Sequence, residues 1–90
     1  MHYIHDEVKR SANLKKHGYD LKDVPLVIES TATVTFEDKR FDYGEQRFIT
    51  LGMLRDVVVV VVTAEADEEV RVISMRKAER NEQEIYFKNL

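Results

Sequence analysis

The feature that most restricts the fold is an uninterrupted run of six valines, Val57–Val62. Valine is β-branched and favours extended backbone over helix. A strand with one face in water would alternate apolar and polar side chains, so a continuous apolar run indicates a strand that is covered on both faces or lies at the centre of a sheet. A membrane-spanning helix needs roughly 20 apolar residues. The run therefore predicts a central strand and no membrane span.

Three further segments are rich in β-branched and aromatic residues and are expected to be strands. They cover residues 31–36, 47–53 and 70–75, while the valine strand covers 57–63. We expect a tight hairpin turn at Leu54–Asp56 and longer acidic loops at 37–46 and 64–69. The four segments predict an antiparallel sheet, and Tyr3–Ile4 is a candidate for a short additional strand.

Helices are expected near both ends of the chain. Asp6 can accept hydrogen bonds from the first turn of a helix, and Gly18 can adopt the left-handed conformation that ends one, which predicts a helix over Glu7–His17. Pro25 fits only the first turn of a helix, so Asp23 is expected to cap a second helix over Val24–Ser30. A last helix is expected over Lys77–Lys88. These elements predict a single α+β domain over residues 1–90.

The composition narrows the class of protein. The chain has 17 acidic and 14 basic residues and a net charge of −3, which argues against nucleic-acid binding by the whole surface but leaves room for a local basic patch. It has no cysteine, which fits the reducing cytoplasm. The histidines lack the spacing of a zinc site, so neither a metal nor another cofactor is expected. The N-terminus becomes charged by residue 6, unlike a signal peptide.

Four residues of the first predicted helix have the spacing of one helical face: Lys9, Asn13, Lys16 and His17. This face could be merely solvated, or it could bind a ligand. His17 lies in the last turn, where the partial negative charge of the helix end stabilises a protonated imidazole. That position suits a general acid and equally suits a plain helix cap.

Three arginines accompany the predicted strands. Arg47 opens one strand, Arg71 lies within another, and Arg76 ends it. Arg47 and Arg71 could share a patch if their strands lie close together. Strict alternation along the strand puts Arg71 and Arg76 on opposite faces. A guanidinium beside apolar residues needs an anionic partner, which is either an acidic side chain or a phosphate held by two hydrogen bonds.

In the last predicted helix, Glu82 lies on the inward face together with Tyr86. Glu82 could pair with Arg76 or His17, in a structural role or in orienting a catalytic residue. Tyr86 is expected in the core or at its rim.

Together, several segments resemble the BrnT toxin family. They are "DEVKRSANLKKHG" at 6–18, "EQRFITLG" at 45–52, the valine strand ending in Thr63, and "RVISMRKAERNEQEIY" at 71–86. The family pattern covers Lys9, Asn13, Lys16, His17, Gly18, Arg47, Gly52, Thr63, Arg71, Ser74, Arg76, Ala78, Glu82 and Tyr86.

The resemblance implies a RelE-like ribonuclease fold and the toxin half of a bacterial type II toxin–antitoxin pair. It implies a metal-independent endoribonuclease that cuts mRNA, arrests translation, and is blocked by a BrnA-type antitoxin. The antitoxin's ribbon-helix-helix domain would bind the operator DNA, so that the toxin meets DNA only through its partner.

We assign expected roles on this basis. Arg71 and Arg76, assisted by Arg47, would stabilise the charge on the phosphate, and His17 would be the acid or base. Lys9, Lys16, Lys77 and Arg80 would hold the RNA backbone, and Asn13, Glu82 and Tyr86 would have orienting or structural roles. The basic residues are expected on one side of the molecule, with the acidic segments 37–45 and 65–69 elsewhere.

The chain also departs from the family pattern. Many members have Trp at the position of His5, Tyr at that of Val62, and an arginine just after Thr63. Two other hypotheses therefore stay open. The chain could be a toxin-fold binding module with weak or no cleavage, kept for antitoxin binding and repression, or an unrelated α+β domain.

Overall fold

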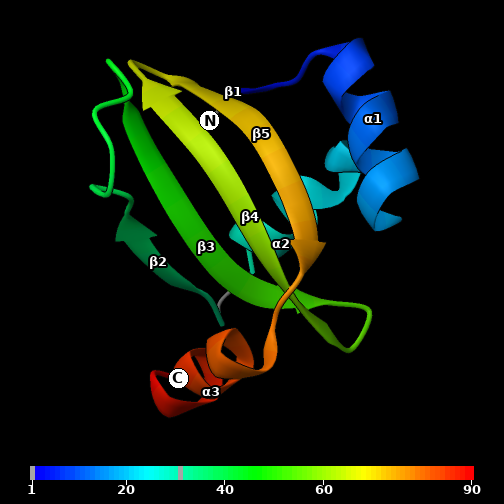
Figure 1. Ribbon diagram of the computed structural model, residues 1–90, viewed down its shortest axis with the longest axis vertical. Coiled ribbons are helices and arrows are strands. Elements are labelled where there is room, and N and C mark those ends of the chain that lie inside the picture. The colour runs from blue at the N-terminus through cyan, green and yellow to red at the C-terminus, as the bar shows by residue number, and fades with distance from the viewer. Residues whose placement is uncertain (1, 31) are drawn as a thin grey trace.

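The computed structural model describes residues 2–30 and 32–90, which form a five-stranded sheet flanked by helices (Figure 1). Along the chain the elements are β1 (His2–Ile4), α1 (Glu7–His17), the 3₁₀ turn η1 (Leu21–Asp23), α2 (Val24–Ile28), β2 (Val34–Glu37), β3 (Gln46–Leu54), β4 (Val57–Ala66), β5 (Glu69–Lys77) and α3 (Arg80–Lys88). The predicted α+β class is confirmed.

The strand order in the sheet is β1-β5-β4-β3-β2. The four predicted strands, β2 to β5, are antiparallel neighbours as expected. The sheet has one strand more than the four expected, because β1 pairs in parallel with β5, with Tyr3 opposite Val70. The candidate strand at Tyr3–Ile4 is thus confirmed, and it adds an edge to the sheet.

The valine strand lies at the centre of the sheet and is covered on both faces, as predicted. Val59 and Val61 belong to a core with residues of η1 and α2. Val58 and Val60 belong to a second core on the opposite face, which α3 covers. Alternation therefore persists within the run: Val57, Val59 and Val61 face the first core and Val58 and Val60 the second, whereas Val62, on the side of the second core, is only half-buried.

Two of the predicted strand boundaries differ from the structure, and the hairpin turn between them agrees with the prediction. The strand expected over 31–36 covers Val34–Glu37, and its expected first residue, Thr31, lies outside the described residues. The hairpin turn after Leu54 is tight, as expected, with positive φ at Arg55 (49°) and Asp56 (66°). The loop expected over 64–69 is wrong, because β4 continues to Ala66 and β5 begins at Glu69. Acidic side chains at this end of the hairpin stay in water while the backbone ladder continues.

The first helix has the predicted bounds and caps, with Asp6 accepting from the Val8 N–H at 2.7 Å. The second is shorter than expected. Asp23 stands at its N-cap position, as expected, but its side chain makes no capping hydrogen bond. A 3₁₀ turn precedes the helix, and the Asp20 carboxylate caps this turn by accepting from the Lys22 N–H at 3.0 Å. The last helix begins at Arg80 instead of residue 77, because β5 continues and the Ala78 N–H still donates to the Val58 carbonyl at 2.9 Å.

A β-bulge in β5 changes which side chains share a face. Val62 pairs with Ser74, but the next residue, Thr63, pairs with Val72, so that β5 contains one extra residue, Ile73. Beyond the bulge the alternation is reversed. Arg71 and Arg76 therefore lie on the same face of the sheet, and the predicted opposite placement is wrong.

Candidate functional site

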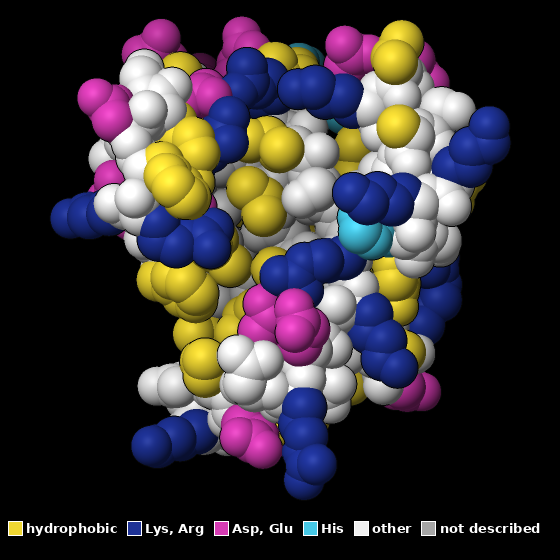
Figure 2. All heavy atoms as spheres, viewed as in Figure 1, with side chains coloured by type: hydrophobic (Ala, Val, Ile, Leu, Met, Phe, Trp, Pro, Cys, Tyr) yellow, Lys and Arg dark blue, Asp and Glu magenta, His cyan; other side chains and the backbone are white. Residues whose placement is uncertain are grey.

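One face of the sheet is partly open. α3 packs over one end of it, where Ala78 and Tyr86 contact the core, and the rest of the face is left uncovered by helices (Figure 1). In space-filling view, Lys and Arg side chains surround a hollow in the middle of this face, with apolar side chains on its floor (Figure 2). We call this surface the open face.

Strand pairing arranges the open face in three rows, each crossing β5, β4 and β3. The rows are Arg76–Val60–Leu51, then Ser74–Val62–Ile49, then Arg71–Ala64–Arg47. Phe36 of β2 extends the middle row. The face thus has an apolar middle row between two rows that carry arginines.

Arg76 is held by Glu82 of α3. Its Nη1 and Nη2 atoms donate to the two carboxylate oxygens, each at 2.8 Å. Glu82 also accepts from the Glu79 N–H at 2.7 Å, within the capping box that starts α3. The hydrogen bonds from Arg76 hold the pKa of Glu82 below its ordinary value, although partial burial opposes this shift. The predicted pairing of Glu82 with Arg76 is confirmed, and it fixes the orientation of the guanidinium.

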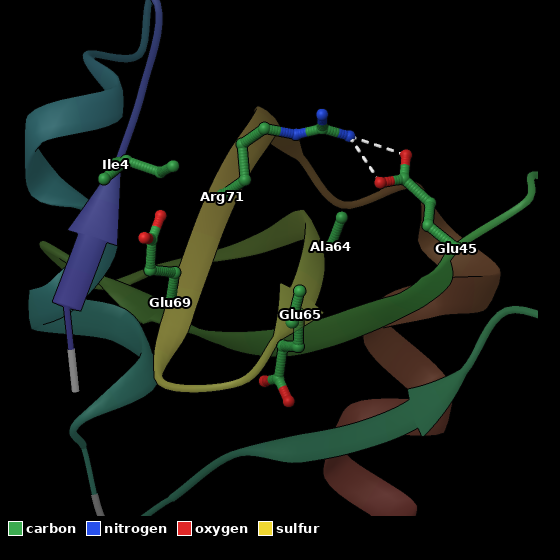
Figure 3. Close-up of a pocket in the computed structure, with 7 residues that line it drawn as sticks. Ile4, Glu45, Ala64, Glu65, Glu69 and Arg71 are labelled. Carbon is green, nitrogen blue, oxygen red and sulfur yellow. Dashed lines mark hydrogen bonds and ion pairs between the residues drawn. The ribbon is translucent and has the colours of Figure 1, made fainter.

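Arg47 and Arg71 share a second carboxylate, that of Glu45. Arg71 Nη2 donates to both oxygens at 2.6 and 2.8 Å (Figure 3), and Arg47 Nη2 donates at 3.3 Å. Burial of Glu45 opposes its ionisation, but the hydrogen bonds and charges of the two arginines outweigh this and lower its pKa. Both arginines pair with Ala64 from opposite sides, so the shared patch expected of them is confirmed.

Arg47 retains hydrogen-bonding capacity. Its guanidinium lies over the ring of Tyr43, with 4.0 Å from Cζ to the ring centroid. Its Nε is buried and has no hydrogen-bond partner within the described part of the chain. An unpaired buried donor costs free energy, so this atom favours an anion or a water beside it.

The acidic segment 37–45 does not lie away from the basic residues, and the expectation that it would is wrong. The chain between β2 and β3 stays beside the open face, where the Asp38 N–H donates to the Arg47 carbonyl at 2.8 Å. The buried Asp38 carboxylate accepts two hydrogen bonds from Arg40, each at 2.9 Å, and one from the Tyr43 hydroxyl at 2.9 Å. The bonds from Arg40 hold the pKa of Asp38 well below its ordinary value.

The face predicted for the first helix is confirmed as a shared surface. Lys9, Lys16 and His17 line a shallow depression in which α1 meets Ile73 and Ser74 of β5. Since Ser74 belongs to the middle row of the open face, this depression borders the open face along β5.

Asn13, at the centre of that helix face, is buried and bonded to the sheet. Its Nδ2 donates to the carbonyls of Met75 and Tyr19, both at 2.9 Å, and its Oδ1 accepts from the Met75 N–H at 3.1 Å. The side-chain amide therefore continues the hydrogen-bonded edge of β5 beyond the three residues that pair with β1. Asn13 fixes the position of α1, and hence of His17, relative to β5.

Three other predicted residues lie apart from this surface. Lys77 pairs with Val59, whose side chain belongs to the core under η1 and α2. Lys77 therefore lies on the opposite face from Arg76, and the prediction that the two share one side is wrong. Arg80 begins α3 with its side chain 95% exposed. Tyr86 is buried, as expected, and its hydroxyl donates to the Ala32 carbonyl at 2.8 Å.

The sequence interpretation missed Glu45, Asp38 and Arg40. The sequence did contain a signal for two ion pairs, Glu45 with Arg47 and Asp38 with Arg40. In each pair the residues are two apart, and on an extended chain such residues point to the same side. As a whole, the open face can hold a polyanion against fixed guanidinium groups, with an imidazole at its border.

Residues 5–82 match the family model described as the ribonuclease toxin BrnT of type II toxin–antitoxin systems. The chain belongs to the BrnT family. The match contains the arginines of the open face, the α1 depression and Glu82. Membership in a type II toxin–antitoxin family implies an antitoxin partner. No individually curated protein matches the chain. Among the described residues of this BrnT protein, no helix has the length and apolar character to cross a membrane.

Proposed function

We propose that this BrnT protein is an endoribonuclease that cleaves single-stranded mRNA on its open face without a metal ion, and thereby arrests translation in the cytoplasm. One observation carries the proposal. The bulge in β5 brings Arg71 and Arg76 to the same face as Arg47, beside the depression that contains His17. Arginine holds phosphate through two hydrogen bonds, so this face suits a phosphodiester chain.

The reaction needs no group from outside the RNA and the protein. The ribose 2′-oxygen attacks the adjacent phosphorus, and the bond to the 5′-oxygen of the next nucleotide breaks. The products are a 2′,3′-cyclic phosphate and a free 5′-hydroxyl. A base takes the proton from the 2′-hydroxyl, an acid gives one to the leaving oxygen, and cations stabilise the additional negative charge on the phosphorus oxygens.

We assign charge stabilisation to Arg71 and Arg76, with Arg47 assisting. Glu82 acts as a positioning residue, because its bidentate contact sets the plane of the Arg76 guanidinium. His17 is the acid or the base, and its place at the end of α1 is fixed through Asn13. Lys9 and Lys16 hold the RNA backbone. Arg80 is exposed at the start of α3 and extends the path, whereas Lys77 lies outside it.

Substitution of Arg76 tests the activity. Arg76→Ala is expected to lower cleavage about 10²–10³-fold, the scale of losing one charge-stabilising donor at a transition state. Arg55→Ala is the matched control, because Arg55 also pairs with a carboxylate, that of Asp23 at 3.3 Å, but lies in the β3–β4 turn. Arg76→Ala alone leaves the Glu82 carboxylate without its partner. The double variant Arg76→Ala/Glu82→Gln removes that charge, and it therefore separates loss of the cation from misfolding caused by an unpaired carboxylate. Wild-type cleavage by a folded Arg76 variant would remove Arg76 from the site.

We propose a BrnA-type ribbon-helix-helix antitoxin as the partner, with a helical segment that covers the basic side of the open face. The toxin would reach operator DNA only through this partner. Opposite charges accelerate association, so Lys16→Glu should slow antitoxin association at low salt and also weaken RNA binding. Lys77→Glu makes the same change of charge on the other face of the sheet and should do neither. Unchanged association by the Lys16 variant would place the partner elsewhere.

A second candidate, a binding module with weak or no cleavage, is favoured by a specific observation. The three arginines of the open face already contact carboxylates, those of Glu45 and Glu82. If these ion pairs persist with RNA present, the arginines cannot neutralise a phosphate fully. Induced expression distinguishes the candidates, because a cleaving toxin arrests growth and the antitoxin relieves the arrest, whereas a binding module allows growth.

A further inference from the structure

The middle row of the open face forms an apolar strip that the proposed chemistry does not use. It consists of Val62, Ile49 and Phe36, from three adjacent strands. Val62 and Ile49 are half-buried, and Phe36 is 43% exposed. Together with Leu51 and Val60 of the neighbouring row, the strip lines a groove of about 400 Å³. A groove of this size is within the range of small-molecule sites.

The strip lies between two arginine–carboxylate pairs. The Arg76–Glu82 pair belongs to the row through Val60, and the Arg71–Glu45 pair belongs to the row through Ala64. Val60 and Ala64 are separated by four steps of β4, about 13 Å at the usual rise of a strand. Along the strand direction the surface therefore presents a charged arginine–carboxylate group, then an apolar stretch, then a second charged group in which two arginines share one carboxylate.

We propose that the apolar strip binds nucleobases of a single-stranded RNA whose phosphates lie at the arginines on either side. The inference rests on the proposed function, since it assigns the bases of the same substrate. A single-stranded nucleic acid alternates charged phosphates with apolar base faces, which is the order of groups on this surface. Proteins that bind single strands combine a basic groove with aromatic side chains on which bases stack.

Phe36 is the residue that the inference singles out. Its ring stands on β2, the edge strand that bounds the groove, and it is more exposed than a phenylalanine of the core would be. Stacking of a base on an aromatic ring contributes about 1–3 kcal/mol by alanine substitution and depends little on base identity. Arg40 and Asn81 line the same groove and supply polar groups for the edges of a base.

Binding of an uncleavable RNA, with 2′-deoxyribose replacing ribose, tests this assignment apart from catalysis. Phe36→Ala is expected to weaken binding about tenfold or more, from the stacking contribution, with an unchanged dependence on salt. Phe36→Leu keeps the apolar volume and should lose part of this affinity. Phe87→Ala is the control, because Phe87 is 58% exposed on α3 but does not line the groove. Thermal unfolding confirms that each variant is folded.

Each outcome decides the matter. Loss of RNA affinity in both Phe36 variants, graded by size and aromaticity, supports the inference. RNA binding by the Phe36 variants equal to that of Phe87→Ala overturns it. Loss of antitoxin binding with intact RNA binding assigns the groove to the partner and also overturns it. If the wild-type protein binds no RNA, the proposed function fails as well, whereas wild-type cleavage with an indifferent Phe36 overturns this inference alone.

Discussion

Substitution of Asn13 tests how the site is held together. Asn13→Ala deletes the amide that satisfies both the N–H and the carbonyl of Met75, a residue with no exposed surface. Each buried backbone group left without a partner costs about 1–3 kcal/mol. The Tyr19 carbonyl is nearer to solvent, and water can replace its lost donor. We therefore expect destabilisation of about 2–5 kcal/mol, toward the upper end of single-residue effects.

The assay is unfolding by urea, followed by the helical signal of circular dichroism. Asn13→Ala should lower the midpoint strongly, whereas Ser11→Ala, an exposed position on the same helix, should change stability by no more than about 0.5 kcal/mol. Asn13→Asp keeps the acceptor for the Met75 N–H but directs a carboxylate toward two carbonyls. Its destabilisation should diminish at acid pH, where the protonated carboxyl can donate. Equal stability of the Asn13 and Ser11 alanine variants would refute the reasoning.

Three further predictions concern the open face and its support. Glu45→Gln should tighten RNA binding and steepen its salt dependence, because it frees Arg47 and Arg71 for phosphate. Glu65→Gln is the control and should change neither, because the Glu65 side chain lines the same pocket but points away from Arg71 (Figure 3). Gly52→Ala should lower the melting temperature, because a Cβ there would lie 2.7 Å from Val27 Cγ1. His17→Ala should slow cleavage about 10²–10⁴-fold; unchanged turnover with lower stability would make His17 a helix cap only.

The pH dependence of stability follows from the acids of the open face. The pKa of Glu82 is lowered by folding, so its ion pair with Arg76 contributes fully above the ordinary carboxyl pKa. That contribution is lost as the pH falls through the lower pKa of the folded state. Glu82→Gln should therefore be less stable than wild type near neutrality and approach it in acid, as measured by urea unfolding at each pH. A constant difference would contradict the linkage.

Much of the fold could be predicted because local signals agreed with the tertiary structure. The valine run identified the central strand, and Asp6 and Gly18 marked the ends of α1, since both features act within a few residues. The bulge at Ile73 could not be predicted, because nothing in the local sequence distinguishes an extra residue from continued alternation. That one residue decides whether Arg71 and Arg76 share a face.

The arginines of the candidate site could be predicted from the sequence, but most of the groups that contact them could not. Arg47, Arg71 and Arg76 were identified from their places on strands, and Glu82 was an expected partner of Arg76, yet the carboxylate shared by Arg47 and Arg71 depends on where the eight-residue connection between β2 and β3 returns across the sheet. The sequence predicts Glu45 in an acidic loop away from the basic residues, whereas the structure places it between two arginines. Asn13 was identified by helical spacing, but its bonds to Met75 depend on the edge of β5 that β1 leaves unpaired.

The central claim is cleavage of RNA by its own 2′-hydroxyl on the open face. The direct measurement incubates the purified protein with a single-stranded RNA in excess EDTA and identifies the ends of the products by mass spectrometry. The account predicts fragments with a 2′,3′-cyclic phosphate and a 5′-hydroxyl, produced by wild type, strongly reduced for Arg76→Ala, and abolished for a substrate with 2′-deoxyribose. Cleavage that requires a divalent cation, or that leaves a 5′-phosphate, would contradict it.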